Sequence, residues 1–278
     1  MSLRNALRAM PTLLRVGFAE SVAYRAEMFV WVLSTTMPLI MMALWTAVAH
    51  EAPVKGFTSQ SFVAYFLGAF VVRQITGAWA AWVINFEVRQ GTLGMRLLRP
   101  ISPLWSYAAE NIAFMPLKLV VTVPVALLSL AIVGAQAVPR TVWGFGAFVL
   151  ALVGGWCISF LANVAIGSLS LYMESSSKVM DVWLALFFVC SGYLYPVELF
   201  PPWAQVLVRW LPFYNQLGMP VELMTAAPGG GGDPGPAGTP VDVGGAAAGA
   251  RARAVAAGPQ TLLGLRRVGE CCADTFAC

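Results

Sequence analysis

The sequence reads SFVAYFLGAFVVRQITGAWAAWVI over residues 61–84, and this stretch decides the fold. Arg73 is its single charged side chain, and most of the other side chains are apolar. A helix needs about 20 mostly apolar residues to cross a bilayer core of about 30 Å. Comparable stretches lie on both sides of it, at residues 26–49, 108–133, 142–172 and 179–199. The pattern therefore predicts an all-α polytopic membrane protein with five transmembrane helices.

The composition agrees with a membrane protein. Hydrophobic residues make up 59% of the 278 positions and charged residues only 11%, against about 25% charged in ordinary soluble domains. The length suits one polytopic domain and leaves no room for a large soluble one. The net charge of +4 indicates no nucleic-acid partner, because most basic residues flank the apolar stretches. The five cysteines lack paired metal-ligand spacing and the only histidine is His50, so we expect no metal site.

Basic residues gather in alternate loops. The segment before the first predicted span and the loops after the second and fourth contain Arg4, Arg8, Arg15, Arg25, Arg89, Arg96, Arg99 and Lys178. The loops on the other side contain only Lys55 and Arg140 before the terminal region. Lys and Arg are enriched in cytoplasmic loops of membrane proteins. We therefore expect a multi-pass protein of the cell's inner (cytoplasmic) membrane, with its N-terminus in the cytoplasm and its fifth span ending outside.

The segment before the first span predicts a short helix that lies on the inner membrane surface. Leu14, Phe18 and Val22 recur at four-residue steps, with Arg15 on another face. Pro11 fits best as the first residue of this helix, because a proline inside a helix removes a hydrogen bond and clashes with the preceding turn. A cytoplasmic extension of the first span is the alternative.

The loop at residues 85–107 reads NFEVRQGTLGMRLLRPISPLWSY and is long for a mere connector. Its sequence predicts a short amphipathic helix that stops at Pro100. One face of this helix is expected to be apolar and the other charged, formed by Leu93, Leu97 and Leu98 and by Arg89, Arg96 and Arg99. Such a helix suits the docking of a soluble partner, but a solvated loop without a partner explains the same residues equally well.

The segment after the fifth span predicts an interrupted structure. Four prolines prevent one continuous helix, namely Pro196, Pro201, Pro202 and Pro212. Between them, one face of a short helix is formed by Trp203, Val206, Leu207, Trp210 and Leu211. This helix can lie at the outer interface or form half of a re-entrant hairpin whose backbone is covered by protein. An outer loop with one surface helix is the alternative.

The order of these features resembles a known family. The pattern Glu-x-Arg-x-Gly-Thr-Leu occupies residues 87–93 and Leu-Leu-Arg-Pro follows at residues 97–100. A Ser-Gly-x-x-x-Pro segment lies at residues 191–196, before the Leu-Pro turn at 211–212. Over residues 1–225 the chain resembles the membrane (permease) subunit of type-2 ATP-binding-cassette (ABC) exporters.

The resemblance implies how such a subunit works. The loop between the second and third spans would form a cytoplasmic coupling helix that docks on a separate ATPase subunit, through Glu87, Arg89, Gly91, Thr92, Leu93, Arg96, Leu97 and Arg99. Two permease subunits, identical or paired with a sister protein, would enclose a path through the membrane lipid. Short re-entrant helices after the fifth span would close its outer end. The expected function is substrate efflux across the inner membrane, with the substrate itself unidentified.

The chain is not expected to be an enzyme. It contains no Gly-x-x-x-x-Gly-Lys-Ser/Thr loop to cradle phosphates. We expect no cofactor in this chain, and ATP and Mg on the partner ATPase. An intramembrane protease would need a catalytic pair within the spans, and none is evident. A non-transporting membrane scaffold or assembly protein remains the alternative function.

Four residues are candidates for the translocation path or its gating: Arg73, Gln74, Tyr193 and Glu198. Arg73 lies near the middle of the second span, where an arginine costs at least about 2.5–3.5 kcal/mol. It either lines the path or forms a structural ion pair with a carboxylate that the sequence does not identify. Glu110 and Lys118 lie nearer the inner surface, where we expect both side chains to snorkel to water.

The composition changes after Thr225. Residues 226–278 are rich in Gly, Ala, Pro and Arg and contain no apolar run of span length. We expect a permease domain over residues 1–225 and a low-complexity, disordered tail over 226–278. The sixth span that the resemblance implies is therefore absent. The tail is either a genuine extracellular segment or the product of a frame shift, and we favour the frame shift.

Overall fold

The computed structural model describes residues 3–23, 30, 35–52, 54–99, 101–133, 142–173 and 176–225. All of them belong to Met1–Gly230, the first of two units into which the chain divides. The start of the first predicted span, Pro100, Arg140 and the tail at 226–278 lie outside the described residues. In the described part the regular elements are helices, apart from one isolated bridge between Val54 and Phe57. The predicted all-α class is confirmed for this part of the chain.

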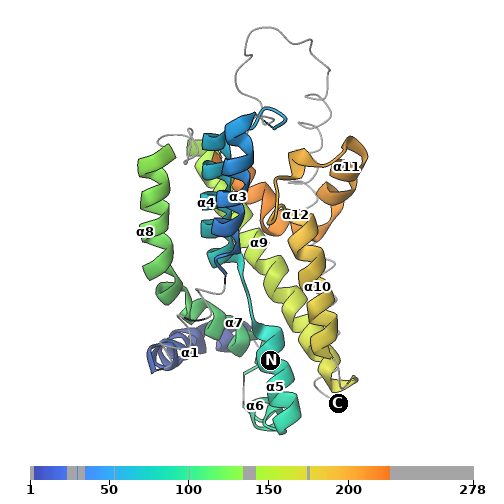
Figure 1. Cartoon of the computed structure of the whole chain (residues 1–278). Coiled ribbons are helices and arrows are strands. Elements are labelled where there is room, and N and C mark those ends of the chain that lie inside the picture. The colour runs from blue at the N-terminus through green and yellow to red at the C-terminus, as the bar shows by residue number, and fades with distance from the viewer. Residues whose placement is uncertain are drawn as a thin grey trace. The chain divides into compact units, whose positions relative to one another are not determined.

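The helices follow one another in a bundle (Figure 1). In chain order they are α1 (Leu3–Ala23), α3 (Met37–Glu51), α4 (Ser59–Thr76), α5 (Ala80–Gln90), α6 (Leu93–Leu97), α7 (Pro103–Ala113), α8 (Met115–Val133), α9 (Val142–Ser168), α10 (Ser176–Cys190), α11 (Pro202–Trp210), α12 (Pro212–Gln216) and α13 (Gly218–Thr225). Two 3₁₀ turns, η2 (Leu169–Leu171) and η3 (Val197–Leu199), separate some of them. Figure 1 shows α1 and α7 lying across one end of the bundle, and α11 at the other end.

Three stretches in the described part are long and apolar enough to cross a membrane. They are Ser59–Gln90, Pro103–Val133 and Trp143–Leu171. The first is largely buried among other helices, whereas most of the other two faces outward. The second predicted span is therefore the central helix of the bundle, and the third and fourth lie at its periphery.

Two of the predicted spans are interrupted. The second span divides into α4 and α5, because Gly77 takes an extended conformation with φ −68° and ψ 127°. The third divides into α7 and α8 at Phe114. Pro116 explains where α8 begins, since a proline in the first turn of a helix loses no hydrogen bond.

Helix α1 is longer than its sequence predicts. It begins at Leu3 and contains Pro11 in its interior, so the prediction that Pro11 starts the helix is wrong. The helix packs against α7 at Gly17, where an added Cβ would lie 2.9 Å from that of Ala113. Phe18 and Val22 are exposed, which leaves an apolar strip on its outer side.

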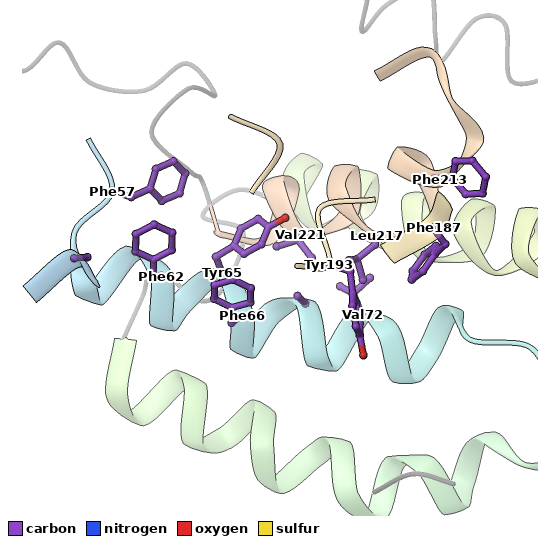
Figure 2. Packing of buried hydrophobic residues seen from close by; sticks show 12 residues of the cluster. Phe57, Phe62, Tyr65, Phe66, Val72, Phe187, Tyr193, Phe213, Leu217 and Val221 are labelled. Atoms are coloured by element: carbon purple, nitrogen blue, oxygen red, sulfur yellow. The ribbon is translucent and has the colours of Figure 1, made fainter. Parts of the chain in front are cut away.

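The largest cluster of buried side chains is built on α4 (Figure 2). Phe62 stacks on Phe57 and on Phe66, with ring centroids 5.2 and 6.3 Å apart. Leu217 and Val221 reach the same cluster from the segment after α10. The end of the described chain therefore returns into the bundle, where α13 packs against α4 and α9.

The fifth predicted span ends nine residues early at Cys190, because the chain turns at Gly192, which has φ +87°. The hydroxyl of Tyr65 donates to the Gly192 carbonyl at 2.8 Å, and a Cβ at this glycine would clash with that hydroxyl. Glycine suits this turn because its φ is positive and because a Cβ would displace the Tyr65 side chain. Beyond it, α11 buries Ala204 and Val208 and exposes Trp203 and Trp210.

Candidate functional site

Helix α5 ends in a turn that the sequence dictates. Gly91 has φ +70°, a conformation that residues with a Cβ rarely adopt. Its N–H donates to the Val88 carbonyl, and the Thr92 N–H donates to the Glu87 carbonyl at 3.0 Å. These two bonds form a Schellman motif, which satisfies the last carbonyls of α5. The turn directs α6 away from the axis of α5.

A network of polar side chains, which we call the Arg96 network, then fixes α6. The Arg96 guanidinium bridges the carboxylates of Glu87 in α5 and Glu110 in α7, the latter at 2.6 Å. The Tyr107 hydroxyl donates to the other oxygen of Glu87 at 2.6 Å, and its ring lies 4.3 Å from the guanidinium carbon. Four side chains therefore tie α5, α6 and α7 together.

The charge of Arg96 is secured by its surroundings. Burial by itself would lower the pKa of Arg96, but the Glu110 carboxylate and the hydrogen bonds to both glutamates raise it above its ordinary value. The side chains of Arg96 and Glu87 are each only 14% exposed. Charge-assisted hydrogen bonds of this kind are stronger than neutral ones, and removing one partner leaves the others uncompensated.

The opposite side of α6 faces outward. Met95 is 67% exposed and Leu98 is 87% exposed, whereas Leu93 is only 5% exposed. The predicted division into a leucine face and an arginine face is therefore wrong, because Arg96 and Leu93 point inward together. We name Gly94, Met95 and Leu98 the outer face of α6.

The eight residues predicted to contact an ATPase occupy different positions. Arg89, Gly91, Leu97 and Arg99 are exposed, and Thr92 is half-buried. Glu87 and Arg96 are committed to the Arg96 network, and Leu93 is buried. The residues most available to a partner thus include Leu98, which the sequence places on the apolar face but not among the eight, and Met95, which the sequence does not single out. Their spacing opposite Leu93 on a single helical turn could have indicated them.

A hollow of about 520 Å³ lies beside this region. Its lining comes from α5 and from the end of η2, with Asn85, Val88, Arg89, Ser170, Leu171, Tyr172 and Met173. The surface at the end of α5 therefore continues onto residues 170–173.

Three of the candidate path residues meet on one side of α4. The Arg73 guanidinium lies over the ring of Phe187 in α10, 4.5 Å from its centroid. The Gln74 amide donates to the Thr35 hydroxyl at 2.8 Å, and the Tyr193 hydroxyl donates to the Thr35 carbonyl at 3.4 Å. Within the described ranges the ion pairs to carboxylates involve Arg96 and not Arg73. The described residues thus supply no carboxylate partner for Arg73, and its charge rests on an aromatic face instead.

The fourth candidate, Glu198, belongs to another cluster. Its carboxyl group lies near that of Glu222 in α13, which accepts the Tyr214 hydroxyl at 2.6 Å. The Oε2 atom of Glu198 is buried without a hydrogen-bond partner in the described part of the chain. The four candidates therefore occupy two separate places, and the sequence analysis missed Glu222.

Comparison with known proteins identifies the family. The sequence profile described as ABC-2 family transporter protein matches residues 33–229, which is more than half of the 278 positions. The chain belongs to the ABC-2 transporter family. No curated protein matches this sequence. The resemblance to ABC-2 type permeases is thereby confirmed, and with it a multi-pass membrane protein with a permease role in ABC transport.

The matched region of this ABC-2 permease extends from α3 to the end of α13. It includes both the Arg96 network and the Glu198 cluster. Tyr107, Glu110 and Glu222 complete these two sites, and all three lie outside the motifs at residues 87–100, 191–196 and 211–212. Lys118, expected to snorkel, is instead buried and donates to the Gly77 carbonyl at 2.8 Å.

Proposed function

We propose that this chain is the permease subunit of an ABC exporter, which forms the translocation path and is driven by a separate ATPase subunit. The observation that carries this proposal is the way α6 is held. The Arg96 network fixes it rigidly to α5 and α7, while its outer face presents Met95 and Leu98 to a partner. An apolar surface on a firmly anchored turn suits the transmission of force better than a mobile loop would.

The proposed topology has five spans. In order, they contain α3, α4 with α5, α7 with α8, α9, and α10. The protein would lie in the inner membrane of the cell, with its N-terminus in the cytoplasm. Helix α1, with its exposed Phe18 and Val22, would lie on the inner surface. Segments α11 to α13 would form the re-entrant outer end. Many exposed apolar side chains on α8 and α9 support contact with lipid, among them Val120, Leu127, Leu128, Leu150 and Val153.

The proposed assembly contains a second permease, either another copy or a sister protein, and an ABC ATPase that binds ATP and Mg. Chemistry would occur on the ATPase alone. Closure of the ATPases would move α6 and open the path outward, so that substrate leaves the cell.

Orientation can be tested with single cysteines in a variant whose five native cysteines are replaced by serine. A membrane-impermeant maleimide should label Gln60→Cys at the outer end of α4 in intact cells. It should label Leu98→Cys only after permeabilisation. Labelling of Leu98→Cys in intact cells would refute the topology and the coupling role together.

Coupling can be tested by replacing the outer face of α6. The variant with Met95→Asp and Leu98→Asp should fail to co-purify with the ATPase that accompanies the wild-type protein. Gln60→Asp, at the end of α4 that is far from α6, is the matched control and should retain co-purification with the ATPase. Unchanged co-purification and ATP hydrolysis in the double variant would show that the outer face of α6 does not couple to the ATPase. A wild-type protein that brings down no ATPase would favour a non-transporting scaffold.

A further inference from the structure

The interruptions of the second and third spans lie side by side. Helix α4 ends at Thr76 and α5 begins at Ala80, while α7 ends at Ala113 and α8 begins at Met115. The ring of Trp79, in the first gap, meets that of Phe114, in the second, with centroids 4.8 Å apart and planes at 90°. Two neighbouring helices of the bundle therefore bend at the same place. We call residues 77–79 the joint.

The backbone groups freed at the joint are satisfied by side chains from three other helices. Lys118 of α8 donates to the Gly77 carbonyl at 2.8 Å. Asn111 of α7 accepts the Trp79 N–H, and Asn163 of α9 accepts the Ala81 N–H, each at 3.4 Å. Inside an apolar bundle an unpaired backbone group is strongly unfavourable. These three side chains are therefore what allows the second span to be broken.

Each of these side chains is buried and held in place. Asn111 and Asn163 are both 3% exposed and Lys118 is 7% exposed. The Asn111 amide donates to the Tyr107 carbonyl at 3.0 Å and the Asn163 amide to the Ser159 carbonyl at 2.9 Å. Each carboxamide oxygen is thereby turned toward the joint. The Lys118 ammonium also lies over the Trp79 ring, 4.8 Å from its centroid.

The joint separates two different parts of the protein. On one side, α4 carries the aromatic core and Arg73. On the other, α5 leads to Glu87 and the Arg96 network. Helix α7 touches both, because Asn111 reaches the joint and Tyr107 and Glu110 reach Arg96. The direction of α5, and with it the position of α6, is thus fixed at the joint and at the Arg96 network.

We propose that the joint links the path-forming half of the second span to its coupling half, and that Lys118 is the positioning residue that holds it. The proposal rests on the coupling role given above to α6. Lys118 is the one charged group among the three, and it binds a carbonyl at the C-terminal end of α4, where the helix dipole favours a cation. A force on α6 would turn α5 about the joint instead of displacing α4 along its axis.

The test uses the full chain with its ATPase, in lipid nanodiscs, and replaces the five native cysteines by serine. Nitroxide labels at Gln60→Cys and Gln90→Cys report the distance between the far ends of α4 and α5 by pulsed EPR. In the wild-type sequence this distance should be narrow at rest and should shift when ATP and vanadate trap the ATPase. Lys118→Met should broaden the resting distribution and abolish the shift, and Lys118→Arg, which keeps a donor and the charge, should restore both.

Two further measurements separate positioning from general instability. Lys118→Met should still co-purify with the ATPase but lower its ATP hydrolysis, because α5 would lose the hydrogen bond at Gly77 that fixes its direction. Lys178→Met, at an exposed position of α10, should change neither the distance nor the hydrolysis. If Lys118→Met does not insert, Asn163→Ala removes the bond to Ala81 together with the bond to Ser159, leaves the Lys118 bond in place, and should give an intermediate broadening.

The outcomes distinguish this proposal from the function on which it rests. Wild-type distances in Lys118→Met, at rest and after trapping, would overturn the role of Lys118. A wild-type protein that binds its ATPase but shows no shift on trapping would overturn the joint and leave coupling intact. Absence of any ATPase association would overturn the proposed function, while the resting distances of the two Lys118 variants would still decide whether that residue positions α5.

Discussion

The ring of Tyr107 lies under the guanidinium of Arg96, and its hydroxyl donates to Glu87, the carboxylate to which Arg96 also donates. This closed arrangement joins α7 to the turn between α5 and α6. A cation over an aromatic face and a shared carboxylate restrict the Arg96 side chain in two directions. The position of α6 therefore depends on a residue of α7 as much as on its own sequence.

We expect Arg96→Gln to lower the free energy of unfolding by about 2 kcal/mol, because Glu87 and Glu110 would be left close together without their shared cation. Arg99→Gln, at an exposed position of the same loop, should have almost no effect. Thermal unfolding of both variants in detergent checks this. Equal stability of the two variants would mean that the Arg96 network does not hold α6.

Tyr107→Phe should separate the two functions of that side chain. The ring and its contact with Arg96 remain, and the hydrogen bond to Glu87 is lost, so we expect a loss of about 1 kcal/mol. Tyr107→Leu removes both contacts and should cost more, by about 0.5–1 kcal/mol. Chemical denaturation of the purified variants measures the difference, and a loss from Tyr107→Phe as large as that from Tyr107→Leu would contradict the role of the ring.

Gly91 and Gly94 form a matched pair three residues apart. Gly91→Ala should destabilise the turn by about 1 kcal/mol, because φ is +70° at this position. Gly94→Ala meets no atom within 4 Å and should instead stabilise α6 slightly, since alanine is the better helix former. Their melting temperatures should therefore move in opposite directions. A shift of the same sign in both would show that the Schellman motif does not govern the turn.

The Glu198 cluster predicts an unusual dependence on pH. Burial, and then the neighbouring Glu198 carboxylate, raise the pKa of Glu222 from 4.5 to about 8. The folded protein thus keeps a proton that the unfolded chain releases. This contribution to stability is complete below pH 4.5 and is lost as the pH rises toward about 8.

Glu222→Gln should flatten that dependence, because the amide cannot titrate and still offers an oxygen to the Tyr214 hydroxyl. Thermal unfolding between pH 5 and about pH 8 measures it. Glu51→Gln, at an exposed position, is the control and should retain the wild-type slope. A variant at Glu222 with an unchanged slope would contradict the assignment.

The class of fold follows from the sequence because lipid imposes long apolar runs. The breaks within those runs do not follow, because Gly77, Ala78 and Trp79 are as apolar as their neighbours. The bend depends on the side chains of Asn111, Lys118 and Asn163, which follow it by 32 residues or more. No local sequence pattern shows that these side chains will contact its backbone. The prediction that Pro11 begins a helix was wrong for the opposite reason. Its local preference for the first turn was outweighed by the packing of a continuous α1 on α7.

The candidate site shows the same division. The short helix in the loop at residues 85–107 could be predicted from the sequence, and it is α6. The inward direction of the Arg96 side chain could not be predicted. A charged side chain is expected to face solvent, and the two carboxylates that bind Arg96 belong to α5 and α7. Lys118 was misplaced for the same reason: a lysine near a span end is expected to snorkel, and here a freed carbonyl holds it inside.

The satisfied backbone at the joint also constrains how the protein is made. Lys118 follows Gly77 by 41 residues, and Asn163 follows Ala81 by 82. A ribosome has therefore synthesised α7, α8 and most of α9 before the last of these bonds can form. Until then, the backbone N–H and C=O groups between α4 and α5 face the translocon or lipid without all of their hydrogen-bond partners. Biogenesis of this permease thus requires α4 and α5 to remain beside α7 and α8 until α9 is in place.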